Sequence, residues 1–257
     1  MRGVVLGGAT VVPARFVVGA DGVWSRTAKL VEAVEDPTHP ASSAVYYAYY
    51  RGVDTDGVYF QFTPGVSAGL IPTNGDEVCV YVGWPLDQIS AFRSDPDPAF
   101  SDQLSRSHPD LGAAVAAGVR VSGFKGTPGL PGFLRQAWGP GWALVGDAGF
   151  TKDPISAHGM SDALRDAELC ARAIDRSLQD PGRELEAMSQ YQELRDRLSR
   201  PILELSTELA GFRWDVARAS TIMRGLSVAV KDECDVMAVL PEWPGVTSRA
   251  LAGRVSG

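Results

Sequence analysis

The chain has 257 residues, of which 45% are hydrophobic and 21% are charged. This length and balance suit a globular protein of one or two domains with a large buried core. The net charge of −7 argues against a nucleic-acid-binding or anionic-membrane-binding surface, because such surfaces need a concentration of basic side chains. No apolar run approaches the roughly 20 residues of a membrane-spanning helix, so we expect no membrane span.

The three cysteines, Cys79, Cys170 and Cys234, are too far apart for a Cys-x-x-Cys motif or a zinc site. Their odd number and wide spacing favour reduced thiols, so we expect a cytoplasmic protein with no metal site. The N-terminal residues form a short apolar run without a small-residue cleavage site, and they lead directly into a strand-like segment. We therefore interpret Gly3 to Val12 as a strand rather than as part of a signal peptide.

The next segment is a short apolar strand that ends in an Asp-Gly turn. Val17 and Val18 are followed by Gly19-Ala20-Asp21-Gly22, and Thr27 to Val34 reads as a helix. Asp-Gly is also a very common turn dipeptide, so this motif gains weight only from a second motif later in the chain.

From residue 36 to 125 the pattern changes to strands joined by turns. β-Branched and aromatic residues dominate four runs, which are Val45–Arg51, Val58–Phe62, Ser67–Ile71 and Glu77–Trp84. These runs predict an antiparallel sheet. Side-chain alternation places Tyr47, Tyr49 and Arg51 on one face of the first strand. That face can offer aromatic rings to a planar substrate, although packing against another layer explains each tyrosine equally well.

The remaining segments read mainly as helices. Helical patterns cover Asp87–Gly118, Glu184–Leu198 and parts of Pro201–Gly257. Arg120 to Phe124 reads as a strand that leads back to the layer of the first apolar strand. Trp214 and Trp243 are expected to be packing residues.

The most constrained stretch of the chain is a strand, a glycine-cornered turn, a proline-bearing loop and a helix start. Ala143-Leu144-Val145 forms the strand, Gly146 allows a close backbone approach, and Asp147 offers a charged acceptor at the end where open α/β sheets bind ligands. Pro154 disfavours a helix in the loop that follows, and a helix is predicted from Gly159. The first amides of that helix point back toward the turn and favour negative charge there.

These two turn segments together resemble the flavin fingerprints of the class A flavoprotein monooxygenases, the para-hydroxybenzoate hydroxylase-like family. The resemblance implies an FAD cofactor, with Gly146 and Asp147 at the ribityl chain and Pro154 beside the isoalloxazine ring. It also implies that the helix start at Gly159 and Met160 faces the pyrimidine edge of the flavin.

The resemblance extends to the earlier turn and to the sheet. Asp21 and Gly22 match the Asp-Gly fingerprint, which implies a position between FAD and the path of the nicotinamide donor, NAD(P)H. The resemblance also implies that the sheet between the two fingerprints forms the roof of a substrate cavity. Tyr47, Tyr49 and Arg51 are then candidate contacts to a small-molecule substrate.

The chain departs from the family pattern in two places. The family often has a histidine after Gly-Asp-Ala, where this chain has Gly149 and Phe150. The family also opens with a Gly-x-Gly-x-x-Gly turn that binds the FAD pyrophosphate, and no such turn precedes Asp21. His158, in the proline-bearing loop, is a candidate contact to the pyrimidine ring or the substrate. A packing or surface role explains this histidine equally well.

The implied fold is α/β (α+β), with an incomplete FAD-binding Rossmann-like layer, an inserted antiparallel substrate sheet and C-terminal helices. We expect an FAD-binding domain from residues 1–35 and 126–180, a substrate sheet from 36–125 and a helical region from 181–257. Because both fingerprints would serve one cofactor, Val17-Val18 and Leu144-Val145 should be neighbouring strands, with Asp21 and Asp147 near one cleft.

The resemblance implies an FAD-dependent oxidoreductase, most simply an NAD(P)H-driven monooxygenase that hydroxylates a small aromatic or polyketide-like substrate. One alternative is a flavin halogenase or an isoprenoid reductase of related fold, although Trp138 to Trp142 does not reproduce the halogenase signature Trp-x-Trp-x-Ile-Pro. The other is a non-catalytic remnant that folds but cannot hold FAD. Either a true start upstream of Met1 or a shortened relative explains the missing pyrophosphate turn, and the oligomeric state is not indicated.

Overall fold

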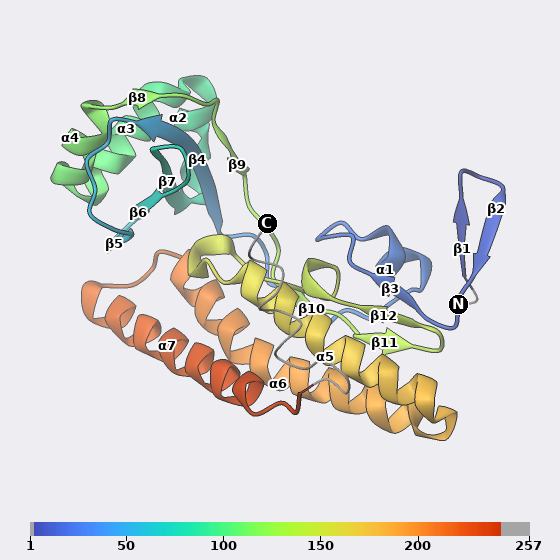
Figure 1. The fold of residues 1–257 in the computed structure, drawn as a ribbon. Coiled ribbons are helices and arrows are strands. Elements are labelled where there is room, and N and C mark those ends of the chain that lie inside the picture. The colour runs from blue at the N-terminus through green and yellow to red at the C-terminus, as the bar shows by residue number, and fades with distance from the viewer. Residues whose placement is uncertain (1–2, 243–257) are drawn as a thin grey trace, which may run out of the picture.

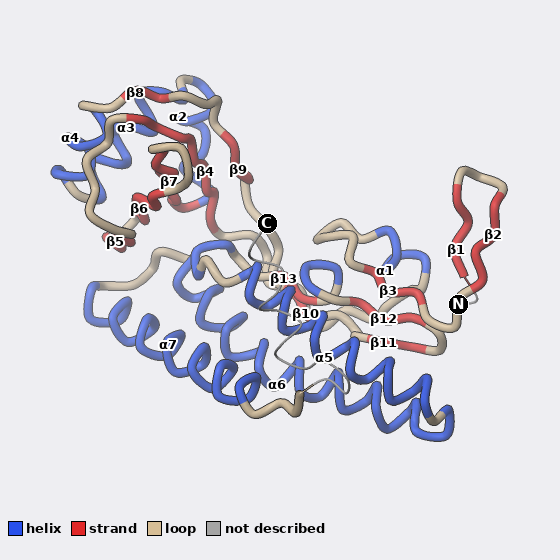
Figure 2. The backbone as a smooth tube through the Cα atoms, viewed as in Figure 1, coloured by secondary structure: helices blue, strands red, loops and turns tan. Residues whose placement is uncertain are grey.

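The computed structural model describes residues 3–242, which form three connected parts (Figures 1 and 2). A small parallel layer lies beside three long C-terminal helices, and a sheet unit with its own helices stands at one end of that assembly. The arrangement confirms the predicted α/β fold with an inserted antiparallel sheet. No helix in this part of the chain is long and apolar enough to cross a membrane.

The parallel layer joins the two turn segments that are far apart in the sequence. Its strands and the small pair beside them are β3 (Val17–Gly19), β11 (Trp138–Gly139), β12 (Trp142–Leu144), β10 (Phe133–Leu134) and β13 (Phe150–Thr151). β12 runs parallel to β3, with Ala143 opposite Val18. The Val145 amide continues this pairing by donating to the Gly19 carbonyl at 3.0 Å. This confirms the prediction that the two motif strands are neighbours.

The sheet unit is antiparallel, as predicted. Its strands lie in the order β5-β6-β7-β4-β8, and β9 also pairs with β4; their bounds are β4 (Ser43–Arg51), β5 (Tyr59–Thr63), β6 (Val66–Pro72), β7 (Glu77–Pro85), β8 (Val119–Arg120) and β9 (Lys125–Thr127). The strand predicted for Arg120 to Phe124 is the shorter β8, which begins one residue earlier, and the chain then returns through β9 to β10 beside the parallel layer. The free edge of β4 takes up this segment, because its backbone groups need partners, and Val121 donates to the Tyr49 carbonyl at 2.8 Å.

Helices cover one face of that sheet. They are α2 (Ile89–Ser94), α3 (Pro96–Ser107) and α4 (Pro109–Ala116), preceded by the short turn η1 (Leu86–Gln88). Pro96 and Pro109 sit in the first turns of α3 and α4, where the missing proline N–H has no helical partner to lose. Trp84 and Phe100, each 1% exposed, anchor the core between these helices and the sheet.

The C-terminal helices are α5 (Gly159–Gln179), α6 (Glu184–Ala210) and α7 (Val216–Ala238), with the turn η4 (Pro181–Arg183) between the first two. α6 packs between α5 and α7 (Figure 1). It is longer than predicted and continues through Pro201, because Ile202 and Leu209 bury fully on its inner face and offset the lost backbone bond. Trp214 is a core residue, as predicted, while Trp243 lies outside the described residues.

The N-terminal segment differs from the prediction. Gly3 to Val12 is not one strand but belongs to a hairpin of β1 (Gly3–Leu6) and β2 (Thr10–Pro13), because Gly7 and Gly8 adopt left-handed conformations that turn the chain. The helix predicted for Thr27 to Val34 is the shorter α1 (Arg26–Leu30), which ends before the left-handed Glu32. The hairpin projects from the molecule (Figure 1) with Val5, Leu6 and Val11 more than half exposed.

Candidate functional site

The two motif turns meet at a cavity of about 730 Å³ between the ends of β3 and β12 and the start of α5. Six of the seven residues predicted to contact the cofactor line it: Gly22, Gly146, Asp147, Pro154, Gly159 and Met160. The seventh, Asp21, lies between Ala20 and Gly22, which both line the cavity. The structure therefore brings the predicted cofactor residues together around one space.

Gly146 sets how closely the parallel layer approaches α5. Its φ of +55° is left-handed, and a β-carbon built there would lie 3.0 Å from the Cβ of Ala163. Val145 before it is extended, and the short turn η2 (Gly146–Ala148) follows. Glycine thus lets the strand end, the turn and the helix crowd together, which leaves Asp147 at the mouth of the cavity.

The Asp147 side chain is an unused acceptor. Only its backbone carbonyl is engaged, by the Thr151 hydroxyl at 3.0 Å, and no donor to its carboxylate is found among residues 3–242. Desolvation raises the pKa of Asp147; Lys152 opposes this rise and the nearby Asp162 adds to it. Asp147 is exposed, so a ligand hydroxyl that donates to this carboxylate would displace water rather than a donor of residues 3–242.

Asp21 differs from Asp147, because its carboxylate already accepts hydrogen bonds from other residues of the chain. It accepts from the Ser25 hydroxyl at 2.6 Å and from the backbone amides of Arg26 and Thr27 at 2.8 and 2.9 Å. Although desolvation acts to raise its pKa, these hydrogen bonds dominate and lower it. Asp21 therefore caps the start of α1 and shapes the turn beside the cavity.

The loop from Lys152 to His158 forms one wall of the cavity. Asp153 accepts from the Ser43 hydroxyl at 2.6 Å and from the Ile155 amide at 3.0 Å, and burial raises its pKa despite these bonds. Pro154 begins the tight turn η3 (Pro154–Ser156). The Ser156 hydroxyl oxygen is buried without a hydrogen-bond partner among the described residues. The loop thus ties the cavity to β4 through Ser43 and keeps one polar group unpaired.

Sequence reasoning missed a buried charge cluster behind this loop, which consists of Lys152, His158, Asp162, Arg165, Asp166 and Glu233. Glu233, on α7, lies 3.2 Å from His158 Nε2 and accepts from Arg165 Nη1 at 2.7 Å. The available signal was the spacing of Asp162, Arg165 and Asp166, three charged residues near the start of α5 on a face that packs inward. Nothing local could have identified Glu233 as their partner.

His158, Asp162 and Glu233 place one potential metal-ligand atom each within 4.8 Å of one another. Both carboxylates, however, already pair with the Arg165 guanidinium, and Asp162 also pairs with Lys152. A divalent cation there would face two permanent positive charges. We therefore interpret the group as an ion-pair network rather than as a metal site.

The candidate substrate residues of the sheet do not line this cavity. Tyr47 and Tyr49 share the face of β4 that α2–α4 leave open, with ring centroids 5.9 Å apart. Arg51 lies at the end of that strand, with its side chain 60% exposed and bound to Glu77 at 2.6 Å. His158 is not among the residues that line the cavity, and its Nε2 lies 3.2 Å from Glu233 Oε1. The two tyrosines stay candidates for a substrate wall, and Arg51 is better explained by its surface ion pair.

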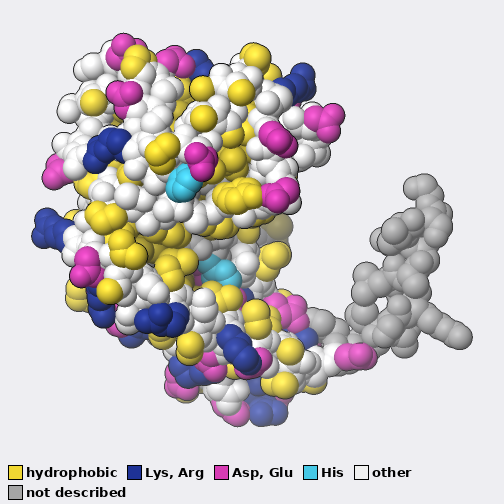
Figure 3. Space-filling view, turned by 90° about the vertical axis from the view of Figure 1, so that its left-hand side faces the viewer, with side chains coloured by type: hydrophobic (Ala, Val, Ile, Leu, Met, Phe, Trp, Pro, Cys, Tyr) yellow, Lys and Arg dark blue, Asp and Glu magenta, His cyan; other side chains and the backbone are white. Residues whose placement is uncertain are grey.

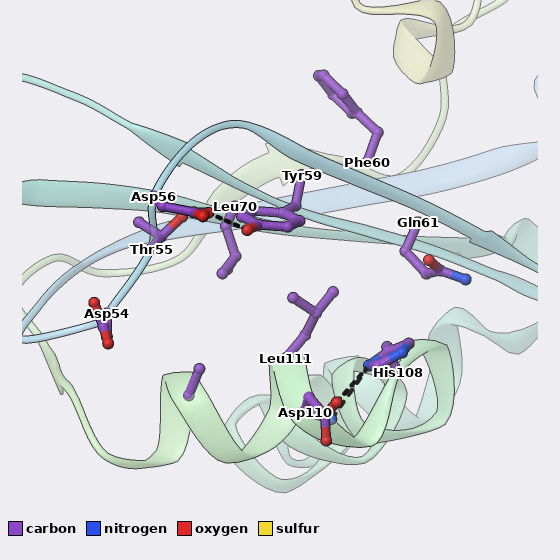
Figure 4. A pocket seen from close by; sticks show the side chains of 11 residues that line it. Asp54, Thr55, Asp56, Tyr59, Phe60, Gln61, Leu70, His108, Asp110 and Leu111 are labelled. Carbon is purple, nitrogen blue, oxygen red and sulfur yellow. Dashed lines mark hydrogen bonds and ion pairs between the residues drawn. The ribbon is translucent and has the colours of Figure 1, made fainter.

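A second cavity of about 490 Å³ lies between β5, the loop before it and α4 (Figure 4). Its rim carries Asp54, Asp56 and Asp110, and Tyr59 donates to Asp56. Leu111 forms part of an apolar floor. Hydrophobic side chains also gather over the sheet unit and its junction with the helices on the face in Figure 3, with charges of both signs interspersed. None of the predicted site residues lines this second cavity.

The comparisons with known proteins identify the family of the chain. A family model described as FAD binding domain matches residues 1–206. The chain belongs to this FAD-binding family, within the class A flavoprotein monooxygenase group.

Two curated relatives differ in their chemistry. The chain is 30% identical over 176 residues to 6-methylpretetramide 4-monooxygenase of Streptomyces rimosus, covering 65% of this chain and 41% of that protein. It is 23% identical over 191 residues to digeranylgeranylglycerophospholipid reductase 2 of Methanococcoides burtonii, covering 71% and 44%. The chain thus spans about half the length of the curated relatives that it matches.

Among solved structures, PqsL of Pseudomonas aeruginosa in complex with 2-aminobenzoylacetate matches with a TM-score of 0.71 at 25% identity. The match covers 85% of this chain and 61% of that one. Flavin-dependent halogenases also share the fold, at identities of 12% to 18%. At that level of identity the halogenases show the fold alone.

Proposed function

We propose that the chain is the flavin-end portion of an FAD-dependent oxidoreductase, in particular an NAD(P)H-driven monooxygenase that acts on a small aromatic or polyketide-like molecule. The observation that carries this proposal is the single cavity shared by the Asp-Gly turn and the Gly-Asp turn. The free thiols of Cys79 and Cys170 favour a cytoplasmic location.

The described residues fit the ribityl and ring end of FAD. Among residues 3–242, no donor reaches the Asp147 carboxylate and the Ser156 hydroxyl is unpaired. No atom of these residues lies within 4 Å of where a β-carbon of Gly159 would sit. Bound FAD would supply electron transfer and oxygen chemistry. Asp147 would hold the ribityl hydroxyls, Pro154 would pack against the ring, and the first amides of α5 would face its pyrimidine edge.

The protein's own contribution to the reaction is to position the bound ligand and to exclude water from the cavity. Gly146 brings the Asp147 carboxylate close to the start of α5, so that one ligand can meet both. The buried wall from Thr151 to Asp153 limits water on one side of the cavity. Tyr47 and Tyr49, on the open face of the sheet, are proposed as the wall for a planar substrate.

The phosphate end of FAD needs donors that the described residues do not group together. β3 pairs only with β12 among residues 3–242, and Val18 on it is 44% exposed, although parallel strands are normally covered on both faces. Trp24 and Leu30 nearby are 66% and 77% exposed. We propose that a strand, glycine-turn and helix segment adds to the free edge of β3 and supplies amides for the pyrophosphate.

The test is spectroscopic. The chain would be titrated with FAD, alone and with such a segment fused before residue 1, and the flavin absorption and fluorescence followed. NADH and NADPH would then be added without oxygen to see which one bleaches the bound flavin. A fused chain that takes up no FAD would refute the proposal and leave the non-catalytic binding module as the remaining explanation.

The reductase relatives support a second candidate, an isoprenoid reductase that uses the same flavin cavity. The two functions separate in one measurement, because a monooxygenase consumes O₂ with its substrate whereas a reductase saturates a double bond anaerobically. The halogenase alternative has less support, since Trp138 to Trp142 forms the β11–β12 hairpin without the Trp-x-Trp-x-Ile-Pro signature.

A further inference from the structure

Lys152 is a buried cation in the wall of the flavin cavity. Its side chain is 5% exposed, its ammonium pairs with the carboxylate of Asp162, and its Nζ lies 5.0 Å from the centre of the Phe150 ring. Among residues 3–242, Lys152 is the only lysine or arginine that lines the cavity. A buried lysine must be held by such contacts, because an unpaired ammonium in this position is costly.

Its partner, Asp162, lies in the first turn of α5 and is 2% exposed. At that position the carboxylate is favoured by the helix dipole, but it also cancels the positive potential that the helix start presents to the cavity. Arg165 also contacts Asp162, at 3.0 Å, yet it is shared with Asp166 and Glu233. Among the ion pairs of the described residues, Lys152 alone is committed to Asp162.

These charges reach the cavity itself. Asp147, at the cavity mouth, has its pKa raised mainly by desolvation, while Lys152 lowers that pKa and Asp162 raises it. Lys152 and Asp162 therefore act in opposite directions on a group that lines the same space. Removal of the lysine would therefore make the potential at Asp147 more negative.

We propose that Lys152 sets the charge of the flavin cavity by neutralising Asp162, so that the start of α5 still favours a bound ring that gains negative charge on reduction. The inference rests on the proposed function for the identity of the ring. The electrostatic part concerns this chain alone and is testable without a ligand.

The ligand-free experiment compares Lys152→Met, Asp162→Asn and the double variant with the parent chain. The pKa of Asp147 is followed by NMR of a chain labelled with ¹³C at aspartate carboxyls. We expect it to rise in Lys152→Met, to fall in Asp162→Asn and to be intermediate in the double variant. Lys125→Met, which removes an exposed lysine of the sheet unit, is the matched control and should leave the Asp147 pKa unchanged. An unchanged Asp147 pKa in folded Lys152→Met overturns the proposal.

The second experiment uses riboflavin in its oxidised form and, without oxygen, in its chemically reduced form. The ratio of the two dissociation constants measures how far the cavity prefers the reduced ring. Lys152→Met should lower this preference about tenfold, whereas Lys152→Arg should retain it. Equal ratios in parent and Lys152→Met would overturn the role of Lys152. If neither form binds even to the chain that carries the fused N-terminal segment, the proposed function fails, and the Asp147 titration still decides whether Lys152 controls the charge of the cavity.

Discussion

Glu233 Oε1 lies 3.2 Å from His158 Nε2, although 75 positions separate the two residues. The contact links α7, the last described helix, to the residue that precedes α5 at the cavity. A second bond from Arg165 to the other oxygen of Glu233, at 2.7 Å, fixes the carboxylate from both sides. The far end of the chain therefore takes part in holding the loop that follows Pro154.

We expect Glu233→Gln to destabilise the fold at neutral pH and to do so less in acid. Burial alone acts to raise the pKa of Glu233, but the bonds from His158 and Arg165 dominate and lower it. A lowered pKa stabilises the fold above the ordinary glutamate value of about 4.3, and this stabilisation is lost as the pH falls through the folded pKa. The expected loss at pH 7 is about 1.5–3 kcal/mol.

Urea unfolding at pH 7, 5 and 3.5 measures this effect. Asp232→Asn is the control, because Asp232 is the preceding residue of the same helix and makes only an exposed pair with Arg197. It should change the free energy of unfolding by no more than about 0.5 kcal/mol. A Glu233→Gln penalty that stays constant down to pH 3.5 would show that the charge of Glu233 is not the cause.

Asp147→Ala should weaken FAD binding about tenfold to a hundredfold in a chain that binds it. The unpaired carboxylate is proposed to accept from a ribityl hydroxyl, and a charged hydrogen bond contributes about 1.5–3 kcal/mol. FAD fluorescence titration with unchanged circular dichroism is the measurement. Asp102→Ala, which removes an exposed acid of α3, is the control. Equal affinities for parent and Asp147→Ala would remove Asp147 from the site.

Residues 1–257 alone should bind FAD only in the micromolar range or more weakly, and fusion of a strand, glycine-turn and helix segment should restore tight binding. The contacts at Gly146, Asp147 and Gly159 address the uncharged ribityl and ring, so the pyrophosphate lacks several charge-assisted bonds of about 1.5–3 kcal/mol each. Purification of the 257-residue chain as a yellow protein with near-stoichiometric FAD would contradict this expectation.

Gly146→Ala should destabilise the fold more than Gly7→Ala does. Both glycines have a φ of +55°, but the new methyl group would meet Ala163 in one case and open space in the other. The shared backbone strain costs about 1–2 kcal/mol, and crowding against α5 adds roughly 1 kcal/mol or more. Thermal unfolding of the two variants separates these effects, and equal shifts would mean that α5 yields to the methyl group without cost.

The sequence predicted the structure best where the residues that form a local motif also determine where that motif lies in the fold. The pairing of β3 with β12 was predictable because two strand ends with similar turns imply one ligand site. The strands of the sheet unit were predictable from alternation and turn residues. Where a segment had a choice of partners, as Val121 did, the pattern could not show that the edge of β4 would take it.

Other features depend on packing that no short window contains. Pro201 lies inside α6 because the inner face of that helix is buried on both sides of it. The pairing of Arg165 with Glu233 joins two helices across 68 positions. The engaged state of Asp21 and the free state of Asp147 also look alike in sequence, since each acid simply follows or precedes a glycine at a strand end. Only the positions of Ser25 and Thr27 distinguish them.

The hydrogen bond from Ser43 to Asp153 has a mechanical consequence. Ser43 begins β4, one of the two strands by which the sheet unit is connected to the rest of the chain, and Asp153 directly precedes Pro154 in the cavity wall. A rotation of the sheet unit about these connections would therefore pull on the loop that lines the cavity. A molecule bound at the sheet would then change the shape of the cavity by moving the backbone, without touching a ligand inside it.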